Sequence, residues 1–217
     1  MSFDARLKEN FKIFVSGPSR CGKTSFVMKL LNNIQAFCKE PPEEIIYVYS
    51  IWQSKYDEMS FIVDHFVKDD ESMHEKIQDI TVGQKVLVIF DDMIHSPSLP
   101  MIAKLFTVDS RHNNLSLIFL TQSLFIDKDH FRQISRNADY FCIFKNVRDA
   151  SEIRRLAQQM TPGSMELVDI HRYATKNPWS YLFIDLTQEC DDKYRYRYNL
   201  FENHHYIEVI IPSGKYT

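Results

Sequence analysis

The chain has 217 residues, of which 44% are hydrophobic and 25% are charged, and its formal net charge is -3. This length fits one α/β domain with a sizeable core, and this composition is that of a soluble globular protein. The negative charge argues mildly against bulk affinity for nucleic acid. No apolar run approaches the roughly 20 residues of a membrane span, and the polar start MSFDARLKENFK is no signal peptide, so no membrane partner is expected.

The four cysteines lie far apart and form no C-x-x-C pair; they are Cys21, Cys38, Cys142 and Cys190. This spacing is typical of a reduced intracellular protein. It favours neither a disulfide framework nor a zinc site.

Apolar runs of strand length alternate with segments of helical character. The runs are continuous rather than alternating, which predicts strands that are buried on both faces, as in a parallel sheet. Strands are expected at 11–15, 45–49, 86–90, 115–120, 140–144 and 181–185, and helices at 23–38, 54–67, 99–108, 128–136, 149–160 and 164–174. This alternation predicts a doubly wound α/β sheet. Residues 188–204 are expected to form a hairpin or a surface excursion.

The first chemical motif is FVSGPSRCGKTSF, residues 14–26, which contains the pattern G-x-x-x-x-G-K-[ST] between a strand and a helix. Glycines at both ends let backbone N–H groups turn inward around phosphate, and the following helix adds the positive end of its dipole. Lys23 would neutralise the β- and γ-phosphates, and the Thr24 hydroxyl would bind Mg²⁺. The expected nucleotide contacts are Gly17, Pro18, Ser19, Arg20, Cys21, Gly22, Lys23, Thr24 and Ser25.

Cys21 lies inside this loop, next to Gly22 and the start of the helix. The helix dipole and the nearby charge of Lys23 predict a lowered pKa and a raised reactivity for its thiol. We therefore expect alkylation to inactivate the protein and bound nucleotide to protect it.

The second motif is KVLVIFDDM, residues 85–93, in which an apolar strand ends in two acids. Adjacent carboxylates at a strand end are costly to bury unless a cation or water uses them. Asp91 would hold Mg²⁺ through water, and Asp92 would orient or deprotonate the attacking water. The alternative is an ordinary turn after a strand. An acid at the second position favours the hydrolysing branch of P-loop proteins, and the guanine motif N-K-x-D does not occur.

The third motif is SRHNNLSLIFLTQSLF, residues 110–125. Gln122 follows the strand, where its amide could sense the γ-phosphate and the attacking water; the alternative is a capping residue. Arg111 precedes the strand, where it could reach the nucleotide of a neighbouring subunit; the alternative is a surface arginine.

Two segments could contact DNA phosphates. Residues 104–155 hold nine Lys and Arg against six Asp and Glu, a local excess of three positive charges, although a solvated mixed-charge surface explains this equally well. The segment KYRYRYN, read as a strand, would place Lys193, Arg195 and Arg197 on one face. Its alternative is an exposed edge strand that its charges protect from aggregation.

Together these motifs resemble the FtsK–HerA superfamily of DNA-translocating ATPases. The strings RHNNLSLIFLTQSLF, SRNADYFCIFKNVRDASEIRRLAQQ and PWSYLFIDL are similar to its viral genome-packaging branch, the poxvirus-type ATPases and their relatives in Maverick/Polinton-type elements and virophages. The resemblance spans residues 11–187. It implies that 1–217 is a single P-loop NTPase domain of the RecA-like/ASCE type with a C-terminal extension at 188–217, and a mostly parallel central sheet with helices on both faces.

The resemblance implies an ATP-driven, Mg²⁺-dependent motor that packages double-stranded DNA into a capsid. It would assemble as a hexameric or pentameric ring, contact viral capsid proteins, and act inside the host cell, in the cytoplasm or nucleus, or with the virion. Many superfamily members have glutamate as the second acid, whereas this chain has the shorter aspartate. The roles carried over are phosphate and Mg²⁺ binding for Lys23 and Thr24, metal acid for Asp91, catalytic acid for Asp92, sensor for Gln122 and trans finger for Arg111.

Two other functions fit the same residues. The chain could be a regulatory or assembly P-loop protein that binds ATP without moving DNA, or a replicative DNA helicase. Stepwise movement of duplex DNA without strand separation would favour packaging over a helicase.

Overall fold

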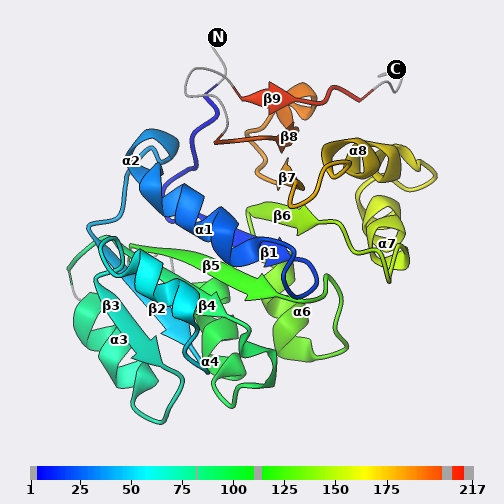
Figure 1. Cartoon of the computed structure of the whole chain (residues 1–217). Coiled ribbons are helices and arrows are strands. Elements are labelled where there is room, and N and C mark those ends of the chain that lie inside the picture. The colour runs from blue at the N-terminus through cyan, green and yellow to red at the C-terminus, as the bar shows by residue number, and fades with distance from the viewer. Residues whose placement is uncertain (1–3, 82, 110–113, 202–206, 213–217) are drawn as a thin grey trace.

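A computed structural model describes residues 4–81, 83–109, 114–201 and 207–212. In this part of the chain a sheet of nine strands has the order β3-β2-β4-β5-β1-β6-β7-β8-β9 (Figure 1). The strands β1 to β6 are parallel, and β7 to β9 continue the sheet antiparallel. Their bounds are β1 (Lys12–Ser16), β2 (Glu44–Tyr49), β3 (His65–Lys68), β4 (Val86–Asp91), β5 (Leu115–Thr121), β6 (Tyr140–Phe144), β7 (Tyr181–Asp185), β8 (Tyr196–Tyr198) and β9 (Glu208–Val209).

Helices cover both faces of the sheet, with α1 and α2 above it and α3, α4 and α6 below it in Figure 1. The α-helices are α1 (Lys23–Asn32), α2 (Ile34–Phe37), α3 (Met73–Thr81), α4 (Leu99–Lys104), α6 (Asp129–Arg136), α7 (Ser151–Met160) and α8 (Glu166–Ala174). Shorter turns are the 3₁₀ helices η1 (Ser54–Met59), η2 (Met93–His95) and η4 (Asp192–Tyr194) and the π-helical turn η3 (Leu105–Asp109). None of the described helices combines the length and apolar character that crossing a bilayer requires.

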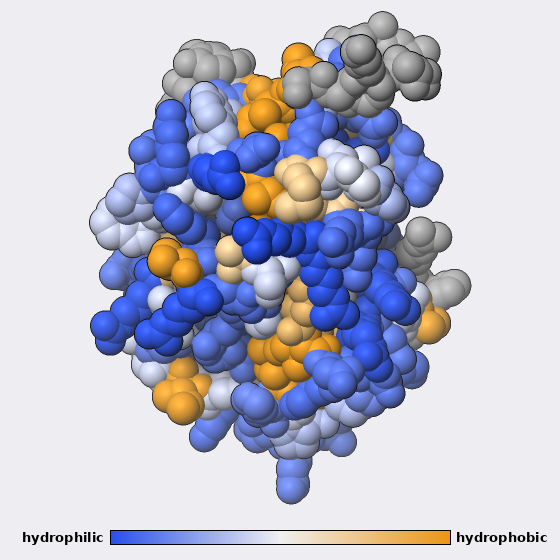
Figure 2. All heavy atoms as spheres, turned by 90° about the vertical axis from the view of Figure 1, so that its right-hand side faces the viewer, coloured by the Kyte–Doolittle hydropathy of each residue, from blue (hydrophilic) through white to orange (hydrophobic). Residues whose placement is uncertain are grey.

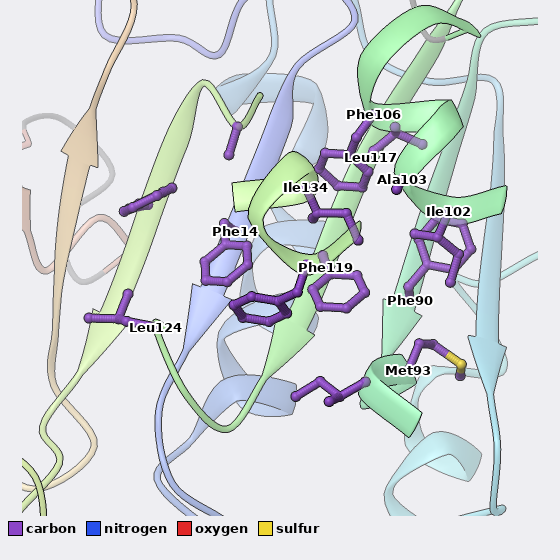
Figure 3. Packing of buried hydrophobic residues seen from close by; sticks show 14 of the residues in the cluster. Phe14, Phe90, Met93, Ile102, Ala103, Phe106, Leu117, Phe119, Leu124 and Ile134 are labelled. Carbon is purple, nitrogen blue, oxygen red and sulfur yellow. The ribbon is translucent and has the colours of Figure 1, made fainter. Parts of the chain in front are cut away.

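Both faces of the sheet are apolar because successive side chains of a strand point to opposite sides. On β1, Ile13 and Val15 belong to the core under α1, whereas Phe14 belongs to the opposite core. There the Phe14 ring stacks against Phe119 of β5, with 6.0 Å between the ring centroids (Figure 3). It also packs edge-on against Phe131 of α6 at 5.5 Å. This two-sided burial explains the continuous apolar runs, and it confirms the predicted fold class: a mostly parallel sheet with helices on both faces.

The face carrying α7 and α8 is mostly hydrophilic, with hydrophobic residues in separate areas (Figure 2). The helices present polar residues outward, while Ile153 and Leu156 of α7 and Leu167 and Ile170 of α8 join the core. The two helices therefore act mainly as a cover for the sheet.

The six predicted strands are confirmed with small shifts of their ends, but the predicted helix 54–67 is wrong. Its first part is the 3₁₀ helix η1, and its last part belongs to β3, which pairs with β2 from Ile46 opposite His65 onward. The ladder of backbone hydrogen bonds along β2 overrides local helix preference here. Helix α3 was not predicted, and the predicted helix 23–38 is divided at Asn33 into α1 and α2.

The C-terminal segment adds β8 and β9 to the sheet and buries one of the predicted DNA contacts. Arg197 is 1% exposed, and its Nη2 donates to Asp185 Oδ2 at 2.5 Å. Its Nε donates to the Tyr194 carbonyl. Lys193 lies in η4 and Arg195 directly follows it, so both precede β8 and the three cations do not share one face of a strand. The buried Arg197 side chain is not accessible to DNA.

Candidate functional site

Three distant segments of the chain meet at the carboxyl edge of the parallel sheet. The order of strands is β4-β5-β1, so β5 lies between the strand before the phosphate loop and the strand that carries the acid pair. Asp91 is in register with Leu120, and Ser16 with Thr121. Carboxyl ends of parallel strands are where ligands of open α/β sheets bind.

The loop between β1 and α1 is shaped by its two flanking glycines. A Cβ on Gly17 would lie 2.6 Å from Phe144 Cβ and 2.7 Å from Cys21 Sγ, which is too close for any side chain. Gly22 has φ 114°, in the left-handed region that favours glycine. The Gly17 N–H donates to the Thr121 carbonyl at 3.2 Å, which fixes the loop to the end of β5.

Lys23 begins α1, and its amine folds back into the loop. Its Nζ donates to the Gly17 carbonyl at 2.6 Å and to the Pro18 carbonyl at 3.1 Å. These acceptors are neutral carbonyls, and in the part of the chain that the structure describes no carboxylate forms an ion pair with the amine. The cation is therefore held where the loop would enclose an anion.

Asp91 ends β4 and is only 7% exposed. Its Oδ2 accepts hydrogen bonds from the hydroxyls of Tyr47, at 2.6 Å, and Tyr56, at 2.9 Å. Burial raises the pKa of this carboxyl, while the two hydroxyls and the charge of Lys23 act in the opposite direction. Among the described residues no cation forms an ion pair with it.

Asp92 has the opposite environment: it is exposed and adopts a left-handed backbone conformation with φ 57°. Its Oδ2 accepts a hydrogen bond from Gln122 Nε2 at 2.9 Å. The second acid and the amide after β5, which the sequence places 30 residues apart, thus form one pair.

The segment after β2 supplies contacts that sequence reasoning missed. Tyr56 lies on η1, and next to it the Lys55 Nζ donates to Ser25 Oγ at 2.6 Å. The segment therefore links the acid at the end of β4 to the first turn of α1. The apolar run that predicted β2 contains Tyr47, but the polar role of its hydroxyl depends on a partner 44 positions further along the chain.

The expected reactivity of Cys21 is not supported. Burial raises the pKa of its thiol, and the opposing effect of Lys23 is smaller. The loop folds Cys21 inward, close to Gly17, so desolvation outweighs the charge that the sequence places two residues away. The predicted lowering of the pKa is therefore wrong.

The remaining predicted site residues differ in their exposure, and one of them is not described. Thr24 and Ser25 lie half-buried in the first turn of α1, and Ser19 and Arg20 are exposed on the loop. Arg111 lies outside the described residues. Of the basic pool, Arg132 pairs with Asp127 and Asp129, and the Lys128 amine donates to the Ile94 carbonyl.

A family model described as "Poxvirus A32 protein" matches residues 1–205 of the chain. Among solved structures, the chain is similar to the genome packaging NTPase B204 from Sulfolobus turreted icosahedral virus 2 in complex with AMPPCP, with TM-score 0.59 and 18% identity over 94% of this chain and 98% of that one. It is also similar to the cytoplasmic domain of the Type VII secretion ATPase EccC from Thermomonospora curvata, with TM-score 0.52 and 12% identity over 94% of this chain and 24% of that one. No curated protein matches the sequence.

Proposed function

Because the chain belongs to the poxvirus A32 protein family, we propose that it is an ATP-hydrolysing motor that moves double-stranded viral DNA into a capsid. The observation that carries the proposal is the meeting of the phosphate loop, the acid pair and Gln122 at one edge of the sheet. A P-loop protein needs these three parts together to bind a nucleotide and activate water. The similar fold of a packaging NTPase that was solved with AMPPCP supports the same proposal.

Residues 17–25 would bind the phosphates of ATP. The first N–H groups of α1 have no partners within the helix and favour an anion at this end. The Lys23 amine would exchange its two loop carbonyls for the β- and γ-phosphate oxygens, which are stronger acceptors because they are charged. The loop is thus shaped for phosphate before phosphate binds.

Thr24 and Asp91 fit a Mg²⁺ site. Magnesium ions at nucleotide sites use one or two protein ligands, with waters and phosphate oxygens completing the octahedron. The described residues contain no cluster of three or more acidic, histidine or cysteine ligands, but such a site needs none. Both tyrosine hydroxyls bind Asp91 Oδ2, so Oδ1 is the oxygen that would hold a water of the ion. When bound, the ion would neutralise charge on the phosphates.

Asp92 would orient or deprotonate the attacking water. Its exposure and left-handed backbone bring it out of the sheet, which offsets the shortness of aspartate compared with glutamate. Gln122 would position Asp92 through their hydrogen bond and could contact the γ-phosphate. Arg111 would act on the nucleotide of the neighbouring subunit in a ring of six or five copies, where it would stabilise the charge of the transition state.

The proposal is tested first by ATP hydrolysis in the presence and absence of double-stranded DNA. Lys23→Ala should lose both nucleotide binding and hydrolysis, whereas Asp92→Asn should bind ATP and not hydrolyse it. Asp79→Asn, an exposed acid on α3, is the matched control and should behave as wild type. Hydrolysis by Asp92→Asn at the wild-type rate would show that the acid pair is only a turn.

Translocation is tested separately from hydrolysis. Displacement of a third strand from duplex DNA, dependent on ATP, is the expected result, together with no separation of the two duplex strands. Strand separation would instead favour a helicase, and hydrolysis that DNA does not stimulate would favour an assembly or regulatory protein. Arg111→Ala mixed with Lys23→Ala should recover activity if the arginine acts between subunits.

A further inference from the structure

Trp179 has an unusual position beside the phosphate loop. It lies between α8 and β7, its side chain is 74% exposed, and its backbone has φ 60°. A left-handed conformation is uncommon for a bulky residue and persists only where the surroundings impose it. Backbone strain of this kind is typical of active sites and ligand-binding positions.

The surroundings of Trp179 connect it to the loop. A Cβ built on Gly22 would lie 3.5 Å from Trp179 Cβ and 3.7 Å from its carbonyl oxygen, so Trp179 lies directly beside the position that glycine leaves open. Two residues further on, the Tyr181 ring packs against Phe26 of α1 at 4.9 Å and against Phe144 of β6 at 5.5 Å. These contacts fix the chain at Trp179 against the start of α1.

The order of strands says which end of a nucleotide would meet Trp179. The acids and Gln122 lie on the β4–β5 side of β1, and they mark the side of the γ-phosphate and Mg²⁺. Strands β6 and β7 lie on the other side of β1, and Trp179 immediately precedes β7. The sugar and base would therefore extend toward Trp179.

The other tryptophan, Trp52, provides a contrast. Its ring packs against Tyr49 at 5.1 Å, Tyr56 at 5.6 Å and Phe66 at 5.1 Å. Trp179 has no such ring partner in the described part of the chain. Its indole face is thus available to another flat ring, whereas that of Trp52 is already used in packing.

We propose that Trp179 stacks on the purine base of the nucleotide held by the phosphate loop. This inference rests on the proposed function, and it adds a base-binding residue to a site so far defined by phosphate and metal contacts. Stacking on an indole is tolerant of base identity because every base has a π-face.

The first test separates base contact from phosphate contact. In the variant Trp52→Phe, Trp179 is the only tryptophan, because the chain has two. ATP should quench its fluorescence, and inorganic tripolyphosphate, which carries no base, should bind without quenching. Equal quenching by both, or by neither while both bind, would overturn the inference.

The second test measures dissociation constants by calorimetry. Trp179→Ala should weaken ATP binding by about tenfold or more, since base–aromatic stacking is lost, while the dissociation constant of tripolyphosphate stays unchanged. Trp179→Phe should recover most of the ATP affinity. Phe61→Ala is the control, because Phe61 is a similarly exposed aromatic residue, at 76%, between η1 and β3.

The outcomes distinguish the inference from the proposed function. An equal loss of ATP and tripolyphosphate affinity in Trp179→Ala would mean that Trp179 supports the loop rather than the base, and the inference would fall alone. If the wild-type protein binds neither ATP nor tripolyphosphate, the nucleotide site itself is refuted, and the proposed function falls with the inference.

Discussion

Two buried aspartates, each at the end of a strand, have contrasting partners. Asp185 ends β7, is 5% exposed, and pairs with Arg197, whose charge is buried with it. Asp91 ends β4, is 7% exposed, and among the described residues its carboxylate accepts hydrogen bonds from the neutral hydroxyls of Tyr47 and Tyr56 alone. A buried charge is stable only when it is paired or coordinated. Asp185 is paired within the chain, whereas no cation among the described residues pairs with Asp91, as expected if Mg²⁺ is its partner.

This contrast separates an acid that the fold itself pairs from the acid that we propose holds the metal ion, although both are equally buried. The Asp185 Oδ1 also accepts hydrogen bonds from the backbone N–H and hydroxyl of Thr187, so its second oxygen serves the local turn. Around Asp91, burial outweighs the stabilising hydrogen bonds and raises the pKa. Removal of each charge should therefore have opposite effects on stability and on activity.

The largest expected effect is the loss of stability in Arg197→Ala. Breaking a buried pair leaves Asp185 charged and alone, which typically costs about 3–5 kcal/mol of unfolding free energy. Urea denaturation measures the loss, and ATP binding by the remaining folded protein should be unchanged. Lys193→Ala, in an exposed pair with Asp191, should leave the denaturation midpoint where it is. If the denaturation midpoint of Arg197→Ala equals that of wild type, the Arg197–Asp185 pair does not stabilise the fold, and Asp185 and Asp91 do not differ in the proposed way.

Asp91→Asn should show the reverse pattern. Its Mg²⁺-dependent ATP hydrolysis should fall by about 10²- to 10³-fold, the loss seen when one preorganised electrostatic group is removed. Its unfolding free energy should be unchanged or higher, because an unpaired buried charge is replaced by a neutral group of the same shape. If Asp91→Asn is strongly destabilised but still hydrolyses ATP, Asp91 has a structural role and does not hold the metal ion.

His171 tests whether a buried group without a charged partner limits stability in acid. Burial lowers its pKa to about 4, and its Nε2 has no hydrogen-bond partner among the described residues. The unfolded chain takes up the proton first, so stability is complete above about pH 6.5 and falls as the pH approaches 4, by about 2–3 kcal/mol at pH 4.5.

The measurement compares denaturation at pH 7.5 and pH 4.5. His171→Gln should lose less stability than wild type between these two values, and His130→Gln, at an exposed position on α6, should lose as much as wild type. The idea fails if the variants at 171 and 130 cannot be told apart.

Tyr56→Phe should have the smallest effect. It removes one of the two donors to Asp91 and leaves Tyr47, so Asp91 is oriented less firmly. Removing such outer partners of a metal ligand typically costs about tenfold or more in metal affinity, and the Mg²⁺ concentration for half-maximal hydrolysis should rise accordingly. Tyr49→Phe, in the same aromatic cluster, should leave this concentration unchanged. If Tyr56→Phe and Tyr49→Phe require the same Mg²⁺ concentration for half-maximal hydrolysis, Tyr56 does not contribute to metal binding.

The sequence predicts those features of the molecule that depend on residues close together in the chain. The phosphate loop is contiguous from Gly17 to Thr24, and the acid pair follows its strand directly, so short-range patterns are sufficient. The strands are recognisable because each is apolar on both faces. The two glycines, whose positions allow no side chain or favour left-handed backbone, also follow from the motif.

What the sequence does not predict depends on partners far along the chain. Tyr56 is a hydrogen-bond donor to Asp91 only because η1 replaces the expected helix and β3 joins β2. Arg197 looks like a DNA contact until Asp185 is placed beside it. Likewise, Cys21 looks reactive from its neighbours, but the fold places its half-buried thiol close to Gly17 and raises its pKa. In each case a long-range contact decides whether a charge or a polar atom is free to act.

The end of β5 connects the phosphate loop to the acid pair through hydrogen bonds. Three consecutive residues make these contacts. The Leu120 carbonyl accepts a hydrogen bond from the Asp92 N–H, and the Thr121 carbonyl accepts one from the Gly17 N–H. The Gln122 amide donates to the Asp92 carboxylate. The phosphate loop and the proposed catalytic pair are thus held by three consecutive residues of the chain. Arg111 precedes the same strand in the sequence, so if it acts between subunits as proposed, one strand would connect the subunit contact to the phosphate loop and the acid pair.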